Sequence, residues 1–207
     1  MRYIIMCGSN HEKINGVPRQ LVTINGERIL DRTIRLLTES GIHLSDISIT
    51  ATDPAFNDCG AQVIDYDSAG DWVNCFLQLE EPTCYIFGDV YFSEDAIRTI
   101  VNTETDTIQF FASAPPFAPN YPKTWAEPFA FKVVDQELFH LSIERTKQIK
   151  QAGGWRREPI AWELWQVIKG TTCNQIIFTN YQTINDYTCD IDCSTDIDYY
   201  RRLFHDS

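Results

Sequence analysis

The sequence has no hydrophobic run that approaches the ~18 residues of a membrane-spanning helix, and its N-terminal YIIM is too short for the apolar core of a signal peptide. Basic residues are scarce: 17 lysines and arginines face 29 aspartates and glutamates, which gives a net charge of −12. Such a protein would repel a long phosphate backbone, so nucleic acid is not an expected partner. Without a long apolar run, a membrane is not expected either. A small anionic ligand stays compatible with this charge if a cation and a few basic residues neutralise it locally.

Two further patterns are missing. The seven cysteines show no spacing typical of a disulfide framework, and their odd number favours a reduced, cytoplasmic protein. The pattern G-x-x-x-x-G-K-[ST] is absent, which excludes a Walker-type phosphate loop. A nucleotide site in this chain must therefore be built in another way.

The sequence does contain ample apolar material and an alternation of strands and helices. Hydrophobic residues make up 43% and aromatic residues 13% of the 207 residues, enough for the core of a single domain over 1–207. Strands are predicted at 2–6, 21–24, 46–52, 61–66, 83–87, 107–113, 128–134 and 174–179, and helices at 30–37, 72–79, from 94 onward, 135–151, 158–170 and 194–204. This alternation is typical of an α/β fold whose largely parallel sheet is covered by helices on both faces.

The first candidate site is the loop that follows the strand 2–6. It is longer than the usual connection of ~4–6 residues, and it leaves the carboxyl end of a strand, where open α/β sheets bind ligands. Gly8 permits a tight turn that brings backbone N–H groups close to a ligand. Lys13 and Arg19 add positive charge, which suits a triphosphate. The alternative is an ordinary surface loop.

The second candidate is Asp89 in YIFGDVYFSEDA, directly behind a buried strand and a glycine. Its carboxylate should lie at the same edge of the sheet as the opening loop, which makes it a candidate ligand of Mg²⁺. The alternative is an acid at the start of a helix, favoured there by the helix dipole. Asp95 fits that alternative better.

The third candidate is the acidic segment CDIDCSTDIDYY near the C-terminus. Asp196 and Asp198 are expected to be helix-start acids, whereas Asp190 and Asp192 precede the helix and have no evident structural role. Clustered carboxylates suit Mg²⁺, and Cys189 and Cys193 lack the partners of a zinc site. Local geometry does not separate Asp190 from Asp192 as the metal ligand.

Together these segments resemble nucleotidyltransferases of the sugar-phosphate, phosphocholine and molybdopterin type. IIMCGSNHEKINGVPRQLVTINGERILDRTIRLL is similar to their N-terminal pattern L-A-A-G-x-G-x-R, P-K-x-L and N-G-x-P-L. FGDVYFSEDA resembles their central metal-binding segment, and DIDCSTDIDYYRRL their D-x-D-T-P-E-D-Y. The residues SNHEKI replace the second glycine and the arginine of the first pattern, and Arg19 stands at the lysine of the second.

The resemblance implies a three-layer α/β/α sandwich with a mostly parallel mixed sheet, the Rossmann-like fold of nucleotide-diphospho-sugar transferases. It implies Mg²⁺-dependent transfer of NMP from an NTP, with CTP or UTP favoured, to a phosphorylated small molecule, and release of pyrophosphate. Arg19 and Lys13 would act as catalytic cations, and alignment on the motif makes Asp89 and Asp192 the metal ligands. The nucleotide would lie against Met6, Cys7, Gly8, Gly70 and Asp71.

The resemblance leaves the acceptor open, because roughly 105–185 match no motif. An acceptor-binding insertion is expected at roughly 114–170, with Lys132 holding the acceptor phosphate; the alternative for Lys132 is a sheet-edge lysine. A glycosyltransferase that uses a nucleotide sugar is a second interpretation, although DVY lacks the second acid of D-x-D. A catalytically silent nucleotide-binding protein is a third, motivated by the altered glycine loop. A homodimer is compatible with the sequence.

Overall fold

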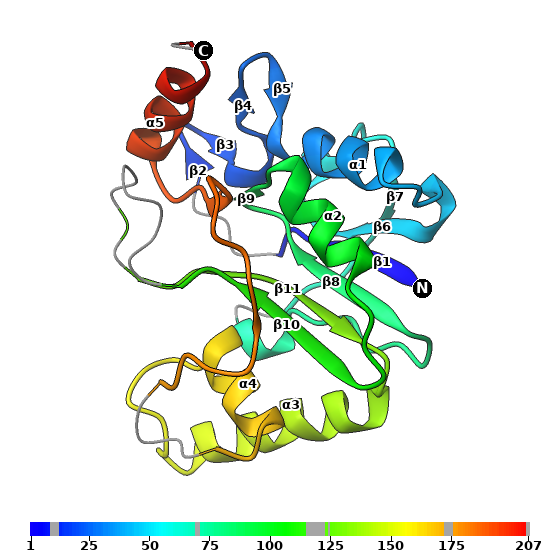
Figure 1. Cartoon of the computed structure of the whole chain (residues 1–207), viewed down its shortest axis with the longest axis vertical. Coiled ribbons are helices and arrows are strands. Elements are labelled where there is room, and N and C mark those ends of the chain that lie inside the picture. The colour runs from blue at the N-terminus through cyan, green and yellow to red at the C-terminus, as the bar shows by residue number, and fades with distance from the viewer. Residues whose placement is uncertain (9–12, 69–70, 115–122, 124, 172–175, 206–207) are drawn as a thin grey trace.

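Seven strands form one central sheet in the structure, a computed structural model that describes residues 1–8, 13–68, 71–114, 123, 125–171 and 176–205 (Figure 1). Their order across the sheet is β12, β10, β11, β8, β1, β6, β7. The strands are β1 (Arg2–Met6), β6 (Ile47–Thr50), β7 (Gln62–Ile64), β8 (Thr83–Phe87), β10 (Ile108–Ala112), β11 (Pro128–Val133) and β12 (Gln182–Thr183).

One strand of this sheet runs against the others. β11 is antiparallel to both of its neighbours, β10 and β8, whereas the remaining pairs of the sheet are parallel. The predicted mostly parallel, mixed sheet is therefore confirmed. In the centre, Met6 at the end of β1 is level with Thr50 of β6 and Phe87 of β8, so that these strands end at one edge.

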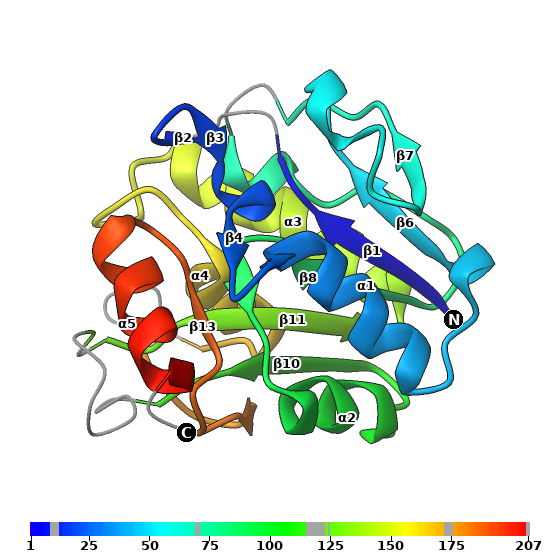
Figure 2. The same cartoon turned by 90° about the horizontal axis from the view of Figure 1, so that it is seen from above.

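Helices cover both faces of the sheet, which confirms the three-layer sandwich. Helices α1 (Ile29–Glu39) and α2 (Glu94–Asn102) lie on one face, and α3 (Gln136–Gln151) and α4 (Ala161–Ile168) lie on the other (Figures 1 and 2). Ser93 caps the N-terminus of α2: its Oγ accepts a hydrogen bond from the N–H of Ala96 at 2.9 Å. The region 114–170, expected to bind the acceptor, supplies β11 and the layer of α3 and α4.

Short hairpins and the last helix gather at the carboxyl edge of the sheet. The hairpins are β2 (Lys13–Ile14) with β3 (Val17–Pro18) and β4 (Thr23–Ile24) with β5 (Glu27–Arg28), and α5 (Ser194–His205) lies beside them (Figure 2). Directly after β8, β9 (Val90–Tyr91) pairs antiparallel with β13 (Cys189–Asp190). This pairing brings the acidic C-terminal segment to the end of the central strand.

The prediction of a helix at 72–79 is wrong. Only a 3₁₀ turn, Trp72–Asn74, forms there, and further 3₁₀ turns span Arg19–Leu21, Leu44–Asp46 and Pro54–Phe56. The carbonyl groups that would continue the helix accept from tyrosines instead: Tyr66 donates to Asn74 at 2.7 Å, and Tyr85 to Leu77 at 2.6 Å. The apolar spacing of this stretch serves core packing, since Phe76 is buried.

The prediction of a strand at 174–179 is also wrong where it can be checked: residues 176–179, which the structure describes, form no strand. The carbonyl group of Thr179 accepts from the indole Nε1 of Trp165 at 3.1 Å, and the chain joins the sheet only at β12. Within the described residues, no helix combines the length and the apolar character needed to cross a membrane.

Candidate active site

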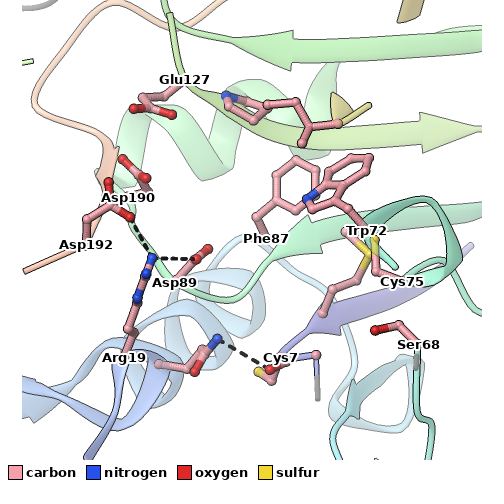
Figure 3. Close-up of a pocket in the computed structure, with 15 residues that line it drawn as sticks. Cys7, Arg19, Ser68, Trp72, Cys75, Phe87, Asp89, Glu127, Asp190 and Asp192 are labelled. Carbon is pink, nitrogen blue, oxygen red and sulfur yellow. Dashed lines mark hydrogen bonds and ion pairs between the residues drawn. The ribbon is translucent and has the colours of Figure 1, made fainter. Parts of the chain in front are cut away.

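A cavity of about 390 Å³ lies at the carboxyl ends of β1 and β8 (Figure 3). This volume is within the usual range for sites that bind small molecules. Segments from both ends and from the middle of the sequence line it: Met6, Cys7, Gly8, Arg19, Gln20, Ser68, Trp72, Cys75, Phe87, Asp89, Glu127, Pro128, Ile160, Asp190 and Asp192.

Backbone atoms form the floor of the cavity. Cys7 donates to the carbonyl of Thr50 at 3.0 Å, and Gly88 donates to the carbonyl of Met6 at 3.0 Å. A Cβ atom at Gly88 would lie 2.7 Å from Sγ of Cys7 and 2.8 Å from the Met6 oxygen, so only glycine allows the ends of β1 and β8 to approach so closely. Met6, Cys7 and Gly8, the predicted nucleotide contacts, therefore lie together at the cavity.

Arg19 joins the three segments that carried the resemblance. Its Nη1 lies 2.5 Å from Oδ1 of Asp192 and 4.0 Å from Oδ2 of Asp89 (Figure 3). The 3₁₀ turn that follows Pro18 carries this side chain, and only 17% of it is exposed. The neighbouring Gln20 donates to the carbonyl of Cys7 at 3.3 Å, and its buried Oε1 has no hydrogen-bond partner among the described residues. That oxygen is available to a ligand.

Asp89 lies where the sequence predicted, directly after β8 and Gly88 at the cavity. Burial raises the pKa of its carboxyl group, and the nearby Arg19 opposes that rise. The main chain of Asp89 also holds the C-terminal segment in place, because its carbonyl accepts from the N–H of Ile191 at 2.9 Å. Asp89 and Asp192 are thereby held on either side of Arg19.

Asp190 and Asp192 belong to a cluster that also contains Glu127 and Lys123. The ammonium group of Lys123 donates to the carboxylate of Asp190, and it lies 2.8 Å from Oδ2 of Asp192 and 3.5 Å from Oε1 of Glu127. The indole Nε1 of Trp125 donates to the same Glu127 oxygen. One carboxylate oxygen from each of the three acids lies within 4.8 Å of the others.

The three acids differ in pKa. Burial and the neighbouring Asp190 raise the pKa of Glu127 to about 8. Burial also raises the pKa of Asp190 to about 6, against the pull of Lys123. Burial acts in the same direction on Asp192, but the hydrogen bond and charge of Lys123, together with Arg19, lower its pKa below the ordinary value. Asp192 is therefore the member of this cluster that most readily carries a negative charge.

Asp196 fixes the backbone that carries Asp192. Its Oδ2 accepts from the N–H groups of Asp192 at 2.8 Å and Cys193 at 3.0 Å. Asp196 lies in the first turn of α5, which confirms the prediction of a helix-start acid. Its side chain is nevertheless only 3% exposed, and it holds the backbone at Asp192, a candidate metal ligand.

The opposite end of the cavity is apolar and aromatic. Trp72 and Phe87 lie with their ring centroids 5.7 Å apart, and Pro128 and Ile160 line the cavity as well. Figure 3 shows the two labelled rings facing the cavity away from the carboxylates. The cavity therefore has a charged half and a half suited to a ring or an apolar group.

Of the predicted site residues, Lys13 and Asp71 do not line the cavity, and Gly70 is not among the residues that the structure describes. Lys13 is exposed and its Nζ lies 3.5 Å from Oδ2 of Asp53, so the structure does not bring it to the lining of the cavity. Asp71 caps the turn that carries Trp72, by accepting from the N–H of Val73 at 3.2 Å, and it lies 3.3 Å from Nζ of Lys150.

Lys132 requires a correction. It is buried in β11 opposite Cys84, toward the amino end of β8, and it donates to the carbonyls of Val101 at 2.8 Å and Thr103 at 2.7 Å. It lines a different cavity, together with Met1 and residues 101–106. Because β11 runs antiparallel to β8, the expected acceptor lysine lies at the opposite edge of the sheet.

The same strand direction explains two residues that the sequence analysis missed. Glu127 immediately precedes β11, and the amino end of an antiparallel strand lies beside the carboxyl ends of its neighbours. Lys123 comes four residues earlier. Both residues belong to the segment KTWAEPFAF, in which a lysine and an acid precede a buried strand. Whether they reach the cavity depends on the direction of that strand, which the pattern alone does not give.

The donor set fits a hard divalent cation. Asp89, Asp192, Asp190 and Glu127 offer carboxylate oxygens, the ligands that Mg²⁺ prefers. Arg19 and Lys123 supply two positive charges beside these acids. A divalent cation would further stabilise the ionised form of Glu127 and Asp190, the two carboxyl groups whose pKa burial raises.

No protein-family model matches the sequence, and no curated protein sequence matches it. Solved structures do match. A Bacillus anthracis protein assigned as a glucose-1-phosphate thymidylyltransferase, in complex with sucrose, has a TM-score of 0.63 and 15% identity, with 100% of this chain and 96% of that chain covered. A CMP:2-keto-3-deoxy-manno-octonic acid synthetase complexed with CTP has a TM-score of 0.58 and 12% identity, with 99% and 98% covered.

The inositol-1-phosphate CTP transferase of T. maritima has a TM-score of 0.57 and 11% identity, with 96% of this chain and 93% of that chain covered. At such identities the likeness establishes the fold. The chain has the fold of nucleotidyltransferases, as the motifs predicted.

Proposed function

We propose that this chain, folded as nucleotidyltransferases are, transfers NMP from an NTP to a phosphorylated small molecule in a Mg²⁺-dependent reaction that releases pyrophosphate. One observation carries the proposal: Arg19 lies between Asp89 and Asp192 in a single cavity. These residues come from the three motifs of the resemblance, and Arg19 and Asp192 are 173 residues apart in the sequence. Their convergence is the arrangement that charge neutralisation on a polyphosphate requires.

The nucleotide would occupy the floor of the cavity. Met6, Cys7 and Gly8 present backbone to a base or a phosphate, and Gly8 has the left-handed φ of 56° that exposes its peptide groups to a ligand. The Trp72 ring offers a face on which a base or a sugar can stack. The resemblance favours CTP or UTP, and two similar structures support CTP: one is complexed with CTP and another is of a CTP transferase.

Asp89 and Asp192 would hold Mg²⁺, with Asp190 as the alternative to Asp192. When bound, the ion supplies positive charge that neutralises the phosphates and fixes their orientation. Arg19 would then exchange part of its pairing with the two aspartates for contact with a phosphate oxygen, to which its planar guanidinium group can donate in a bidentate manner. Lys13 remains a candidate for a second phosphate contact.

The reaction needs no general base from the protein. A phosphate oxygen of the acceptor attacks the α-phosphorus, a new P–O bond forms, and the bond between the α-phosphorus and the bridging oxygen breaks as pyrophosphate leaves. Because the second pKa of a phosphate monoester is about 6, the attacking oxygen is already ionised at pH 7. The protein contributes alignment and electrostatic stabilisation.

Two measurements on the purified protein test the proposal. Thermal unfolding with Mg²⁺ and each NTP in turn should show the largest stabilisation by CTP or UTP. Pyrophosphate release with a panel of phosphorylated acceptors should then identify a productive pair. Asp89→Asn should strongly reduce release and raise the Mg²⁺ concentration that it needs. The matched control is Asp95→Asn, which removes an exposed acid that pairs with Arg98 in the first turn of α2 and should leave release unchanged.

The other outcomes distinguish the alternatives. Stabilisation by a nucleotide sugar, with sugar transfer and no pyrophosphate, would identify a glycosyltransferase. Nucleotide binding without turnover on any acceptor would identify a silent nucleotide-binding protein. Stabilisation by purine nucleotides alone would overturn the preference for CTP or UTP.

A further inference from the structure

The ammonium group of Lys123 lies where the carboxylates of the cavity converge. It donates to the carboxylate of Asp190 and lies 2.8 Å from Oδ2 of Asp192 and 3.5 Å from Oε1 of Glu127. It also lies 3.4 Å from the main-chain oxygen of Asp190. Lys123 is only 5% exposed, so oxygen atoms from three acids enclose its charge. That environment resembles the oxygen cage of a bound cation.

Among these carboxylates, Asp192 is a proposed ligand of the metal ion and Asp190 its alternative, and one oxygen of each of the three acids lies within 4.8 Å of the others. Mg²⁺ binds oxygen at ~2.0–2.1 Å, so an ion shared by Asp190 and Asp192 would take the space that the ammonium group fills. A divalent ion and an ammonium group in contact would also repel each other strongly in a buried setting. The two cations therefore exclude one another at this position.

We propose that Lys123 is a tethered cation that competes with the divalent ion for Glu127, Asp190 and Asp192, and that leaves these carboxylates when the ion arrives with a nucleotide. The phosphates of the nucleotide then offer the ammonium group new oxygen partners. The role of the nucleotide rests on the proposed function, whereas the competition with the ion does not. In the absence of a nucleotide, the competition keeps divalent ions weakly bound, so that ion and nucleotide enter together.

The attachment of Lys123 supports such an exchange. Glu127, four residues on, is fixed to the neighbouring strand: its N–H donates to Oγ of Ser113 at 2.9 Å, and its carbonyl accepts from the N–H of Ser113 at 2.9 Å. The lysine side chain is a flexible four-carbon stem with three rotatable donors. Rotation of the lysine side chain can therefore move the ammonium group from a carboxylate to a phosphate while Glu127 keeps its backbone hydrogen bonds to Ser113.

Binding of Mn²⁺ alone, measured by titration calorimetry without nucleotide, tests the competition directly. Lys123→Met should bind Mn²⁺ about tenfold more tightly than the wild type, because the competing charge is removed from three carboxylates. Lys123→Arg keeps the charge and should keep the weak affinity. Lys147→Met removes a lysine that pairs with Glu144 on α3 and should change nothing.

A second measurement uses the wild-type protein, so it decides the matter even if Lys123→Met does not fold. Acetylation of lysines by acetic anhydride, quantified by mass spectrometry, should increase at Lys123 when Mn²⁺ is saturating. Lys132 is an equally buried lysine at the opposite edge of the sheet, and its acetylation should not respond.

Equal or weaker Mn²⁺ binding by a folded Lys123→Met variant would overturn the proposal, as would unchanged acetylation of Lys123 in the presence of Mn²⁺. Neither readout requires an NTP or turnover. If both behave as expected and pyrophosphate release is absent, the transferase assignment fails while the role of Lys123 stands.

Discussion

Replacing Asp196 should weaken both the fold and the metal response, although this side chain is not part of the cavity lining. Oδ2 of Asp196 accepts two backbone hydrogen bonds, from Asp192 at 2.8 Å and Cys193 at 3.0 Å. A hydrogen bond to a charged group contributes about 1.5–3 kcal/mol, and we expect Asp196→Ala to lose about 2–4 kcal/mol in total, because the exposed Cys193 can turn its N–H toward water. For a chain of this length, that loss corresponds to a fall in Tm of roughly 5–15 °C.

The assay combines urea unfolding with pyrophosphate release titrated against Mg²⁺. Asp196→Ala should need more Mg²⁺ for half-maximal release, because the freed backbone no longer aims the carboxylate of Asp192. Asp196→Asn keeps an oxygen acceptor without the charge and should recover part of both losses. The control is Asp198→Ala, whose side chain is 64% exposed, and it should stay within about 0.5 kcal/mol of the wild type. Wild-type stability and an unchanged Mg²⁺ response in Asp196→Ala would refute the reasoning.

Three further predictions concern the cavity itself. Arg19→Ala should lower kcat/KM roughly a hundredfold to a thousandfold in steady-state assays, the usual cost of losing a hydrogen-bond donor to the charge of the transition state. Arg19→Lys should retain activity. Unchanged kinetics in the alanine variant would exclude Arg19 from the mechanism. Asp192→Asn should impair the Mg²⁺ response of turnover as severely as Asp89→Asn, and if Asp190→Asn alone loses that response, Asp190 is the ligand. Because the pKa of Glu127 in the folded protein is raised to about 8, above the unfolded value of about 4.3, its contribution to stability is present at acid pH and is lost as pH rises toward 8. Urea unfolding without divalent ions should therefore show a shallower loss of stability between pH 5 and pH 8 in Glu127→Gln than in the wild type, and identical slopes would contradict the raised pKa.

The strand ends of the site could be predicted from the sequence because each rests on local information. Buried apolar runs identified β1 and β8, and the residues that follow such runs, Cys7, Gly8 and Asp89, had to lie at the carboxyl edge of a parallel sheet. The C-terminal acids could be assigned to the same edge only through the resemblance, since their pairing beside β9 is a long-range contact.

What the sequence could not provide was the direction of β11. The pattern PFAFKVV is that of a buried strand in either direction, yet the direction decides which end of it reaches the site. Its antiparallel course puts Lys132 at the far edge and Glu127 at the cavity. The mispredicted helix at 72–79 has a different cause, because tyrosine hydroxyls take the carbonyl groups that a helix would use. A homodimer and a cytoplasmic location remain predictions.

Because β11 runs antiparallel, two separate parts of the chain build the cavity. Its floor is formed by residues that follow β1 and β8, whereas Glu127 and Lys123 belong to the chain that enters β11. The pairing of β10 with β11 is locked by the stacked rings of Phe110 and Phe131, whose centroids lie 4.4 Å apart. Sequence changes upstream of Lys123 can therefore be made without altering the residues that pair β11 with its neighbours. A library confined to residues 114–122 would keep Lys123, Glu127 and the ends of β1 and β8, and under the proposed function it would test whether this segment selects the acceptor.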